Sequence, residues 1–395
     1  MVVTLKKRLY LILASITVMI GSGYYLSGKI IQADYYKIVA RYNQNKNTKV
    51  SLLSYKRGIF HSQAKLELQI PSINSNKPQI LPLQQTISHG PLVAVNTPNG
   101  FSLKFIASQI ETCLDGEWQA QLVKYTGNSK PLTMNTIVDF SDQATTWITG
   151  AAINKTTTDN MHITWSALQG EISHDVNFAN YTGNISLPKI SIKADNWDLS
   201  IDELLLKLEK STQTANYLNN KTLRSKSISF NRLQNPIIQI DDIAARLEFI
   251  KNPAQNIDIG LNINVVDSKI LQQKFAQDNI KLQINNLDTN NFPGLPAINA
   301  LNIRTSLEFM QQLTNAKDTR LTIELTKHFT EALISYLSYE IYKSSMLGKL
   351  DKRSDEVIMR DIASSINKLI VSSLNSKLFI DQGMYYALNF DRKSS

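Results

Sequence analysis

Strict alternation of apolar and polar residues is the feature that most restricts how this chain can fold. Over residues 60–70, the even positions are apolar or small and the odd positions are polar. The same period of two recurs over residues 118–122 and 161–165, and most regularly over residues 257–265. Because successive side chains of a strand point to opposite faces, this pattern predicts antiparallel strands with one solvated face. Asn, Gly and Pro clusters such as residues 96–100 predict the turns.

Helical spacing replaces this alternation late in the chain. Apolar residues recur every three or four positions over residues 333–341 and 358–369, and Ser354 stands where a helix N-cap is expected. Residues 378–390 then predict a closing hairpin that turns at residues 381–383. The body is therefore predicted to be of the α+β class, mostly antiparallel sheet with helices in the C-terminal third.

An uncharged run of twenty residues, Leu9–Gly28, precedes this body. As a helix it would be about 30 Å long, which is the thickness of a bilayer core. Three basic residues at positions 6–8 precede the run, and the positive-inside rule then keeps the N-terminus in the cytoplasm. The sequence thus predicts a single-pass anchor in a bacterial inner membrane, with the body in the periplasm of a Gram-negative cell. A cleaved signal peptide is the alternative, but its candidate cleavage site has Ile31 where a small residue is preferred.

The predicted domain organisation follows from this anchor. Residues 1–8 form a cytoplasmic tip, residues 9–28 the transmembrane anchor, residues 29–49 a helical spacer and residues 50–395 the periplasmic β-rich body. Gly23 and Ser27 have the spacing of a helix-dimerisation pair, so a homo-oligomer is one option. The tetrapeptide at residues 125–128 returns at residues 181–184, which either a duplicated strand-turn unit or coincidence would explain.

The charge distribution argues against nucleic acid as a partner. Residues 1–60 hold ten of the 42 basic residues and one of the 33 acidic residues, which leaves 32 of each in the remainder. A nucleic-acid-binding protein would instead carry a basic stripe on its folded domain. The excess positive charge therefore lies beside the uncharged run.

No catalytic, cofactor-binding or metal-binding residue is predicted, and no cofactor is expected. Cys113 is the only cysteine, and the five histidines do not have the spacing of metal ligands: His61, His89, His162, His174 and His328. His89 could act as a general base, but a turn in which Gly90 supplies unusual backbone angles is the preferred interpretation. For Asp241-Asp242, the preferred interpretation is that both are solvated turn residues, and the alternative is a functional pair of carboxylates.

Two short stretches carry a family resemblance. The first is the motif Y-x-R-G-x-F-x-S-x-A, made here by Tyr55, Arg57, Gly58, Phe60, Ser62 and Ala64; the second is His89-Gly90-Pro91. With the uncharged run and Trp165–Gly170, they resemble the YdgA-like family of uncharacterised bacterial envelope proteins. The chain ends differently, because residues 389–393 lack the small-residue motif of that family. The resemblance implies a membrane-tethered envelope protein and lends no activity.

The motif residues are therefore predicted to be structural, with Gly58 at a turn or bulge, the rings of Tyr55 and Phe60 buried, and Arg57 paired with a carbonyl or carboxylate. Anion binding by Arg57 is the alternative. The function predicted is a non-enzymatic envelope scaffold or binding module, for a protein or lipid ligand that the sequence does not identify. Two alternatives remain: a protein that handles acyl chains in an amphipathic β groove, and an enzyme of unrecognised type.

Overall fold

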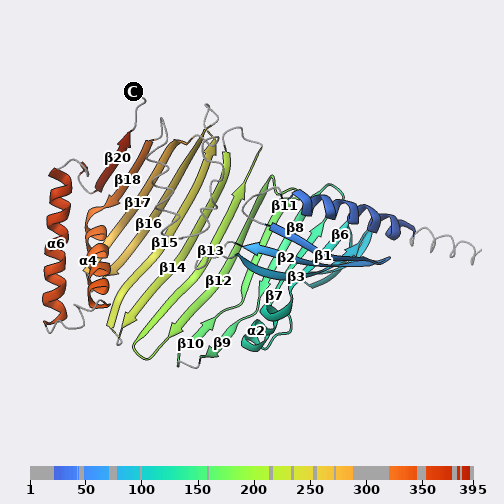
Figure 1. Ribbon diagram of the computed structural model, residues 1–395, viewed down its shortest axis with the longest axis horizontal. Coiled ribbons are helices and arrows are strands. Elements are labelled where there is room, and N and C mark those ends of the chain that lie inside the picture. Colours follow the sequence, from blue (N-terminus) through green and yellow to red (C-terminus); the bar gives the residue numbers. More distant parts are fainter. Residues whose placement is uncertain are drawn as a thin grey trace, which may run out of the picture. The chain divides into compact units, whose positions relative to one another are not determined.

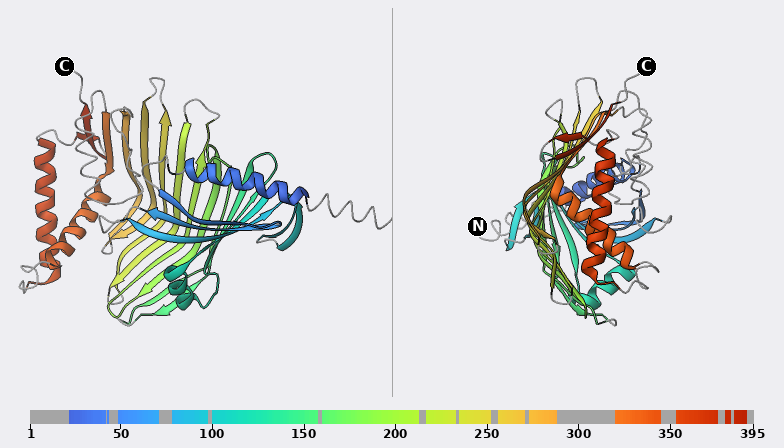
Figure 2. Two further views of the ribbon diagram at one scale, coloured as in Figure 1. Left: turned by 45° about the vertical axis from the view of Figure 1, so that its right-hand side comes forward. Right: turned by 90° about the vertical axis from the view of Figure 1, so that its left-hand side faces the viewer.

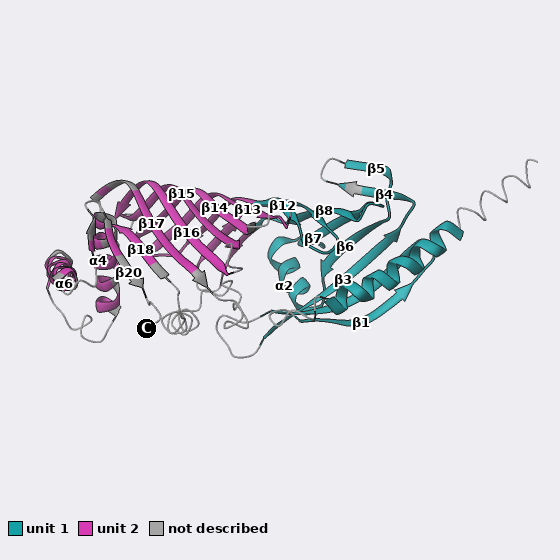
Figure 3. Cartoon of the chain, turned by 90° about the horizontal axis from the view of Figure 1, so that it is seen from above, with its two compact units in different colours: residues 1–153, 167–185, 294–303 teal, residues 154–166, 186–293, 304–395 magenta. Residues whose placement is uncertain are grey.

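The computed structural model divides the chain into two compact units (Figure 3). It describes residues 22–41, 43, 49–70, 78–97, 100–157, 160–212, 217–232, 235–251, 256–270, 273–287, 320–344, 353–375, 380–382 and 385–391. Unit 1 comprises residues 1–153, 167–185 and 294–303, and unit 2 comprises residues 154–166, 186–293 and 304–395.

Unit 1 is an antiparallel sheet with a helix packed on it. Its elements are a helix over residues 22–41, β1 (Lys49–Arg57), β2 (His61–Ile70), β3 (Gln79–His89), β4 (Leu92–Thr97), β5 (Gly100–Phe105), β6 (Ser108–Leu114), α2 (Gly116–Thr126), β7 (Leu132–Val138), β8 (Gln143–Gly150) and β11 (Leu168–Asp175). The strands pair in the order β1, β2, β3, β6, β7, β8, β11, while β4 and β5 form a separate hairpin. Tyr35 of the helix packs on Ala64, Leu66 and Ile87, which anchors the helix to β2 and β3.

The alternation predicted for residues 60–70 is confirmed in β2. Ser62, Ala64 and Leu66 are buried, whereas the intervening His61 and Gln63 are exposed. Around Trp118, however, the predicted strand was wrong, because these residues form α2. The Asp115 carboxylate accepts a hydrogen bond from the Gly116 N–H at the start of this helix, and Gly127 ends it with a φ of 68°.

Of the two explanations for the repeated tetrapeptide, the structure favours coincidence over a duplicated strand-turn unit. Residues 125–128 end helix α2, whereas residues 181–184 begin the strand β12 (Tyr181–Lys193). Two identical tetrapeptides therefore take two different structures, because their conformation depends on the elements on either side.

Unit 2 is a meander of long antiparallel strands (Figure 1). Its elements are β9 (Ile153–Thr156), β10 (His162–Trp165), most of β12, β13 (Trp197–Lys210), β14 (Tyr217–Arg232), β15 (Asn235–Lys251), β16 (Ile257–Ile270), β17 (Gln273–Leu287), β18 (Arg320–Thr326), α4 (Lys327–Ser344), α6 (Asp355–Asn375), β19 (Ile380–Gln382) and β20 (Tyr385–Asp391). Strands β13 to β18 pair with their sequence neighbours, and β20 pairs with both β18 and β19. The predicted strands at residues 161–165 and 257–265 are confirmed. The closing hairpin is present too, but Asp381 and Gln382, which were predicted to lie in its turn, belong to β19.

Helices α4 and α6 lie on one side of the curved sheet of unit 2 (Figure 2). Tyr336 of α4 and Ile270 of β16 are the buried centre of a cluster that Met359 of α6 joins. Both helices were predicted from their spacing, and the N-cap is confirmed because the Val357 N–H donates to Ser354 Oγ at 3.4 Å.

The fold class was nevertheless predicted wrongly. The described chain is mainly antiparallel β-sheet, and its helices also occur early, over residues 22–41 and at Gly116–Thr126. Helices are therefore not a feature of the C-terminal third alone, as the α+β prediction required.

The predicted membrane anchor at residues 9–28 also needs correction. Of the helices in the described ranges, none is both long and apolar enough to cross a membrane. Residues 9–21 lie outside the described residues, and residues 22–28 begin the helix that packs on β2 and β3. The single-pass placement in an inner membrane, with a periplasmic body, is therefore not supported.

Candidate functional site

The two motif stretches meet in unit 1, where the β1–β2 connection lies against the end of β3. The Gly58 N–H donates to the His61 carbonyl at 3.0 Å, and the His89 N–H donates to the Phe60 carbonyl at 2.8 Å. A Cβ at Gly58 would lie 2.4 Å from His61 O. Glycine is thus required by close backbone approach, and neither Gly58 nor Gly90 has a positive φ. The prediction that Gly58 and Gly90 adopt unusual backbone angles was therefore wrong.

Gly90 is enclosed even more tightly. Its N–H donates to the Ala107 carbonyl at 2.7 Å, and the Ile106 N–H donates to the Pro91 carbonyl at 2.9 Å. A Cβ at Gly90 would lie only 1.9 Å from Ile106 O. The Gly90-Pro91 peptide bond is cis. The His89-Gly90-Pro91 stretch therefore fixes the end of β3 against the segment before β6.

The imidazole of His89 forms a buried pair with Ser62. Its Nε2 lies 2.9 Å from Ser62 Oγ and its Nδ1 lies 3.0 Å from Ile59 O. Because a carbonyl only accepts, Nδ1 carries the proton and Nε2 accepts from the serine hydroxyl. Burial lowers the pKa of His89, which keeps the ring neutral. The exposed fractions are 1% for His89 and 0% for Ser62, so a substrate cannot reach the pair in this conformation.

The helix over residues 22–41 covers the same motif. Gly28 lies directly over the His89 ring, where a Cβ would be 2.5 Å from Nδ1. The Arg57 guanidinium lies 4.9 Å from the centre of the Tyr25 ring and donates to its hydroxyl at 3.1 Å. Within the described residues, Arg57 thus contacts a tyrosine and not the expected carbonyl or carboxylate.

The two aromatic residues of the motif differ in burial. Tyr55 is half-buried between the rings of Tyr35 and Tyr36, at centroid distances of 5.3 and 5.8 Å. The Phe60 ring was expected to be buried, but it is exposed. It contacts the Tyr24 ring edge-on, with a distance of 5.1 Å between the ring centroids. The motif therefore holds the helix, the β1–β2 connection and β3 together. Its structural role stays the prediction, and anion binding by Arg57 stays the alternative.

A second candidate site lies in unit 2, at a level where several neighbouring strands are irregular. Glu203 in β13 and Asp242 in β15 both have a φ of 51°. The regular pairing of β14 is interrupted beside both residues, around Lys226. We call the irregular positions at and around Glu203, Lys226 and Asp242 the crease. Asp241 and Asp242 therefore lie inside a strand, and their interpretation as turn residues was wrong.

The hydrophobic pattern changes parity at the crease. In β13, apolar residues alternate at positions 199 and 201 before it and at 204, 206 and 208 after it; in β15 they alternate at 238 and 240, then at 243, 245 and 247. Further apolar residues stand outside this alternation: Leu205 in β13 and Ile237, Ala244 and Ile250 in β15. An irregular residue of this kind interrupts the pleat and re-aims the side chains that follow. Ile238 lies before the crease and Ile280 after it, yet both pack on the cluster around Tyr336. In β16 the buried positions are Ile259 and Val265 on one side of the crease and Ser268 and Ile270 on the other, so the crease keeps both runs on the same face.

A hollow of about 660 Å³ lies at the crease. It is lined by Ser186, Leu187 and Pro188 of β12, Glu203, Leu204 and Leu205 of β13, Arg224, Ser225 and Lys226 of β14, and Asp242, Ile243 and Ala244 of β15. Lys226 Nζ contacts Glu203 Oε1 at 2.8 Å, and the buried Ser225 hydroxyl donates to Asp202 O at 2.8 Å. None of these lining residues except Asp242 was singled out from the sequence.

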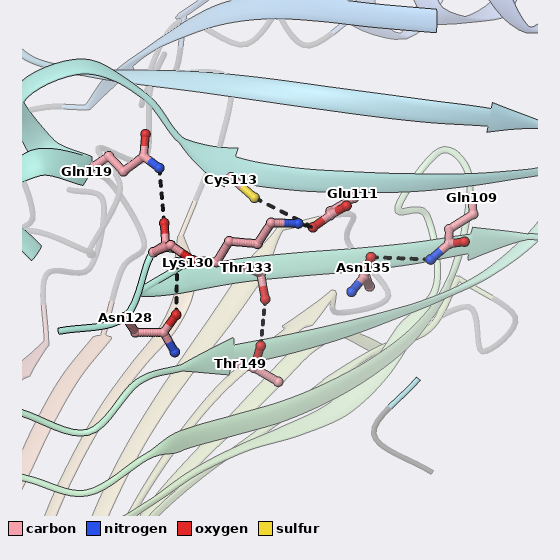
Figure 4. A network of polar contacts seen from close by, with 10 residues as sticks. Gln109, Glu111, Cys113, Gln119, Asn128, Lys130, Thr133, Asn135 and Thr149 are labelled. Atoms are coloured by element: carbon pink, nitrogen blue, oxygen red, sulfur yellow. Dashed lines mark hydrogen bonds and ion pairs between the residues drawn. The ribbon is translucent and has the colours of Figure 1, made fainter. Parts of the chain in front are cut away.

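The remaining polar residues of interest are satisfied within the protein. His174 is buried, with Nε2 2.9 Å from Thr146 Oγ1 and Nδ1 2.8 Å from Asp175 O, and burial lowers its pKa. Figure 4 shows half-buried Cys113 beside Glu111, which forms an ion pair with Lys130. Burial also raises the pKa of Cys113, which disfavours the reactive thiolate. Within the described ranges, no group of three or more His, Cys, Asp or Glu residues could hold a metal ion.

A family model described as "Bacterial protein of unknown function (DUF945)" matches residues 5–389. No curated protein and no solved structure matches the chain.

Proposed function

The chain belongs to this bacterial family of unknown function, and we propose that it is a non-enzymatic binding protein whose ligand occupies the hollow at the crease. The hollow carries the proposal. Its volume of about 660 Å³ lies within the roughly 300–1,000 Å³ that is typical of ligand sites. Four adjacent strands contribute to it, so the site belongs to the sheet itself and not to a loop.

The lining suits an amphipathic ligand. Leu187, Leu204, Leu205 and Ile243 offer apolar contacts, whereas Arg224 and other charged groups of the lining offer polar ones. An acyl chain would bury apolar surface against the former, and its polar head would lie near the latter. This observation favours the acyl-chain alternative as the specific form of the binding function.

The burial of the Ser62–His89 pair away from solvent supports a non-enzymatic role. These two residues have the atoms of a nucleophile and a base, but general base catalysis requires the base within reach of the substrate's proton. Gly28 and the carbonyl of Ile59 enclose the ring instead. We also propose that the chain is a YdgA-like member of its family, because the two stretches that carry that resemblance interlock at this point.

A fluorescent fatty acid tests the binding proposal on the purified full-length chain. We expect saturable binding, measured by fluorescence enhancement. Ala244→Trp places an indole in the hollow and should weaken binding by about tenfold or more, equivalent to about 1.4 kcal/mol. The matched control is Ala120→Trp on the exposed face of α2, which should leave the affinity unchanged. Absence of saturable binding, or equal loss in both variants, would contradict the proposal.

A further inference from the structure

The hairpin β4–β5 displays a row of large apolar side chains. Phe101, Leu103 and Phe105 are 75%, 60% and 72% exposed. Leu92 pairs with Phe105 and Ala94 pairs with Leu103, so these residues share one face of the hairpin. Single exposed apolar residues are ordinary, but a contiguous row indicates an interaction surface.

The opposite face of the hairpin is firmly seated. Val93 and Val95 are buried in a cluster with Ile106 and Ile137, against which Trp147 packs. The displayed face is therefore held in place by the core and is not the product of a loose segment. Phe140, itself exposed, extends the row, because its ring centroid lies 4.9 Å from that of Phe105.

Strand β5 also has an open edge. Among the described strands it pairs only with β4, in a sheet of two strands. An edge strand presents unpaired backbone donors and acceptors to any strand that approaches it. The row of apolar side chains and this edge together form a surface suited to a second strand.

The apolar residues of β5 are placed symmetrically about Leu103, in the order Phe101-Ser102-Leu103-Lys104-Phe105. A two-fold axis at Leu103 would place it opposite its own copy and Phe101 opposite the partner subunit's Phe105. Lys104 would then face the partner's Ser102, so no like charges would meet. Such self-complementarity is what a two-fold interface requires. We propose that β5 pairs antiparallel with β5 of a second copy of this chain.

The area of this surface decides how strong such a dimer would be. An aromatic side chain buries roughly 150–250 Å² when fully covered, so each of the three exposed phenylalanines contributes on the order of 100 Å². With Leu92 and Leu103, each chain offers at most on the order of 500 Å², and pairing edge to edge covers only part of it. The total therefore stays below about 1,000 Å², which is typical of weak interfaces. The dimer should therefore form and dissociate with protein concentration.

Cysteine pairing tests the proposed register in the full-length chain. Cys113 is the only native cysteine, so Cys113→Ser gives a background without thiols. In this background Leu103→Cys places two thiols across the axis, where opposite Cβ atoms are about 4.5–5.5 Å apart. Mild oxidation should yield a covalent dimer. Ala94→Cys, on the same exposed face but on β4, is the matched control and should remain monomeric.

A mixing experiment separates this register from unspecific contact. Phe101→Cys alone should not crosslink, because its two copies would be about 13 Å apart along the paired strands. Phe105→Cys alone should behave in the same way, whereas a mixture of the two variants should form a mixed disulfide. Equal crosslinking of Leu103→Cys and Ala94→Cys, crosslinking of Phe101→Cys with itself, or no dimer at any concentration in sedimentation analysis would overturn the proposal.

Discussion

Replacing Gly90 by alanine tests whether the His89-Gly90-Pro91 stretch closes the fold of unit 1. The added Cβ would lie 1.9 Å from Ile106 O and 2.7 Å from Ala107 O, so the backbone must move apart. This movement disrupts two hydrogen bonds, from the Gly90 N–H to Ala107 O and from the Ile106 N–H to Pro91 O. Each contributes about 1 kcal/mol, and overpacking costs about 1–3 kcal/mol, so we expect a loss of about 3–5 kcal/mol.

Two other glycines give a graded comparison. Gly58→Ala meets only the His61 carbonyl, which also accepts the Gly58 N–H, and should cost about 2 kcal/mol. Gly23 lies in the helix over residues 22–41 with nothing within 4 Å of an added Cβ. Gly23→Ala should therefore stabilise the helix by about 0.5–1 kcal/mol.

Hydrogen exchange is the appropriate assay, because one global free energy of unfolding is poorly defined for a chain of two units. Amides of β3 and β6 should exchange faster in Gly90→Ala, less so in Gly58→Ala, and unchanged or slower in Gly23→Ala. Amides of β14 to β16 in unit 2 serve as the internal reference. If Gly90→Ala exchanged like the parent chain, the close approach at this position would not stabilise the fold and the reasoning would be refuted.

Two further predictions concern pH and the crease. Burial lowers the pKa of His89 and of His174, whereas an unfolded histidine titrates near pH 6.5. Below about pH 6.5 the unfolded chain therefore binds more protons than the folded chain. The free energy of unfolding should decrease as the pH is lowered through this range. Exchange of β3 amides measured at about pH 7.5 and pH 5 should show this loss, and His89→Gln should reduce it; an unchanged slope would contradict the assignment. At the crease, Asp242→Val forces a β-branched residue to a φ of 51° and should lower the free energy of opening, measured by exchange of β15 amides, by about 1–2 kcal/mol. Asp242→Gly should change this free energy by less than about 0.5 kcal/mol. Equal effects of the two variants would refute the role of backbone strain.

Local patterns predicted those elements whose structure is determined locally. The alternation in β2 and the spacing in α4 and α6 each belong to one element, and the structure confirms these elements. The predicted apolar faces of the two helices are less well matched, because Ile341 and Leu369 are 70% and 64% exposed. Helix α2 was missed because its alternating Trp118, Ala120 and Leu122 also fit a strand. Its end signals, Asp115 before the first turn and Gly127 after the last, identify it as a helix.

The motif in unit 1 shows a different limit of sequence reasoning. Its residues were identified, but their partners come from distant parts of the chain, such as Gly28 over the His89 ring and Tyr25 under Arg57. No period or spacing connects residues so far apart. Phe60 was wrongly expected to be buried, because alternation gives the face of a side chain and not whether another element covers that face.

The sequence also encodes the crease, through the parity of its apolar residues. In a regular strand, Ile240 and Ile243 would point to opposite faces, so β15 would expose one of its two apolar runs. One irregular residue between the runs removes this conflict, and Asp tolerates a positive φ better than most side chains. Neighbouring strands that change parity at the same level must be irregular together, as β13 and β15 are at Glu203 and Asp242. The hollow lies at this level, so the shared shift of parity marks in the sequence where the proposed ligand site lies.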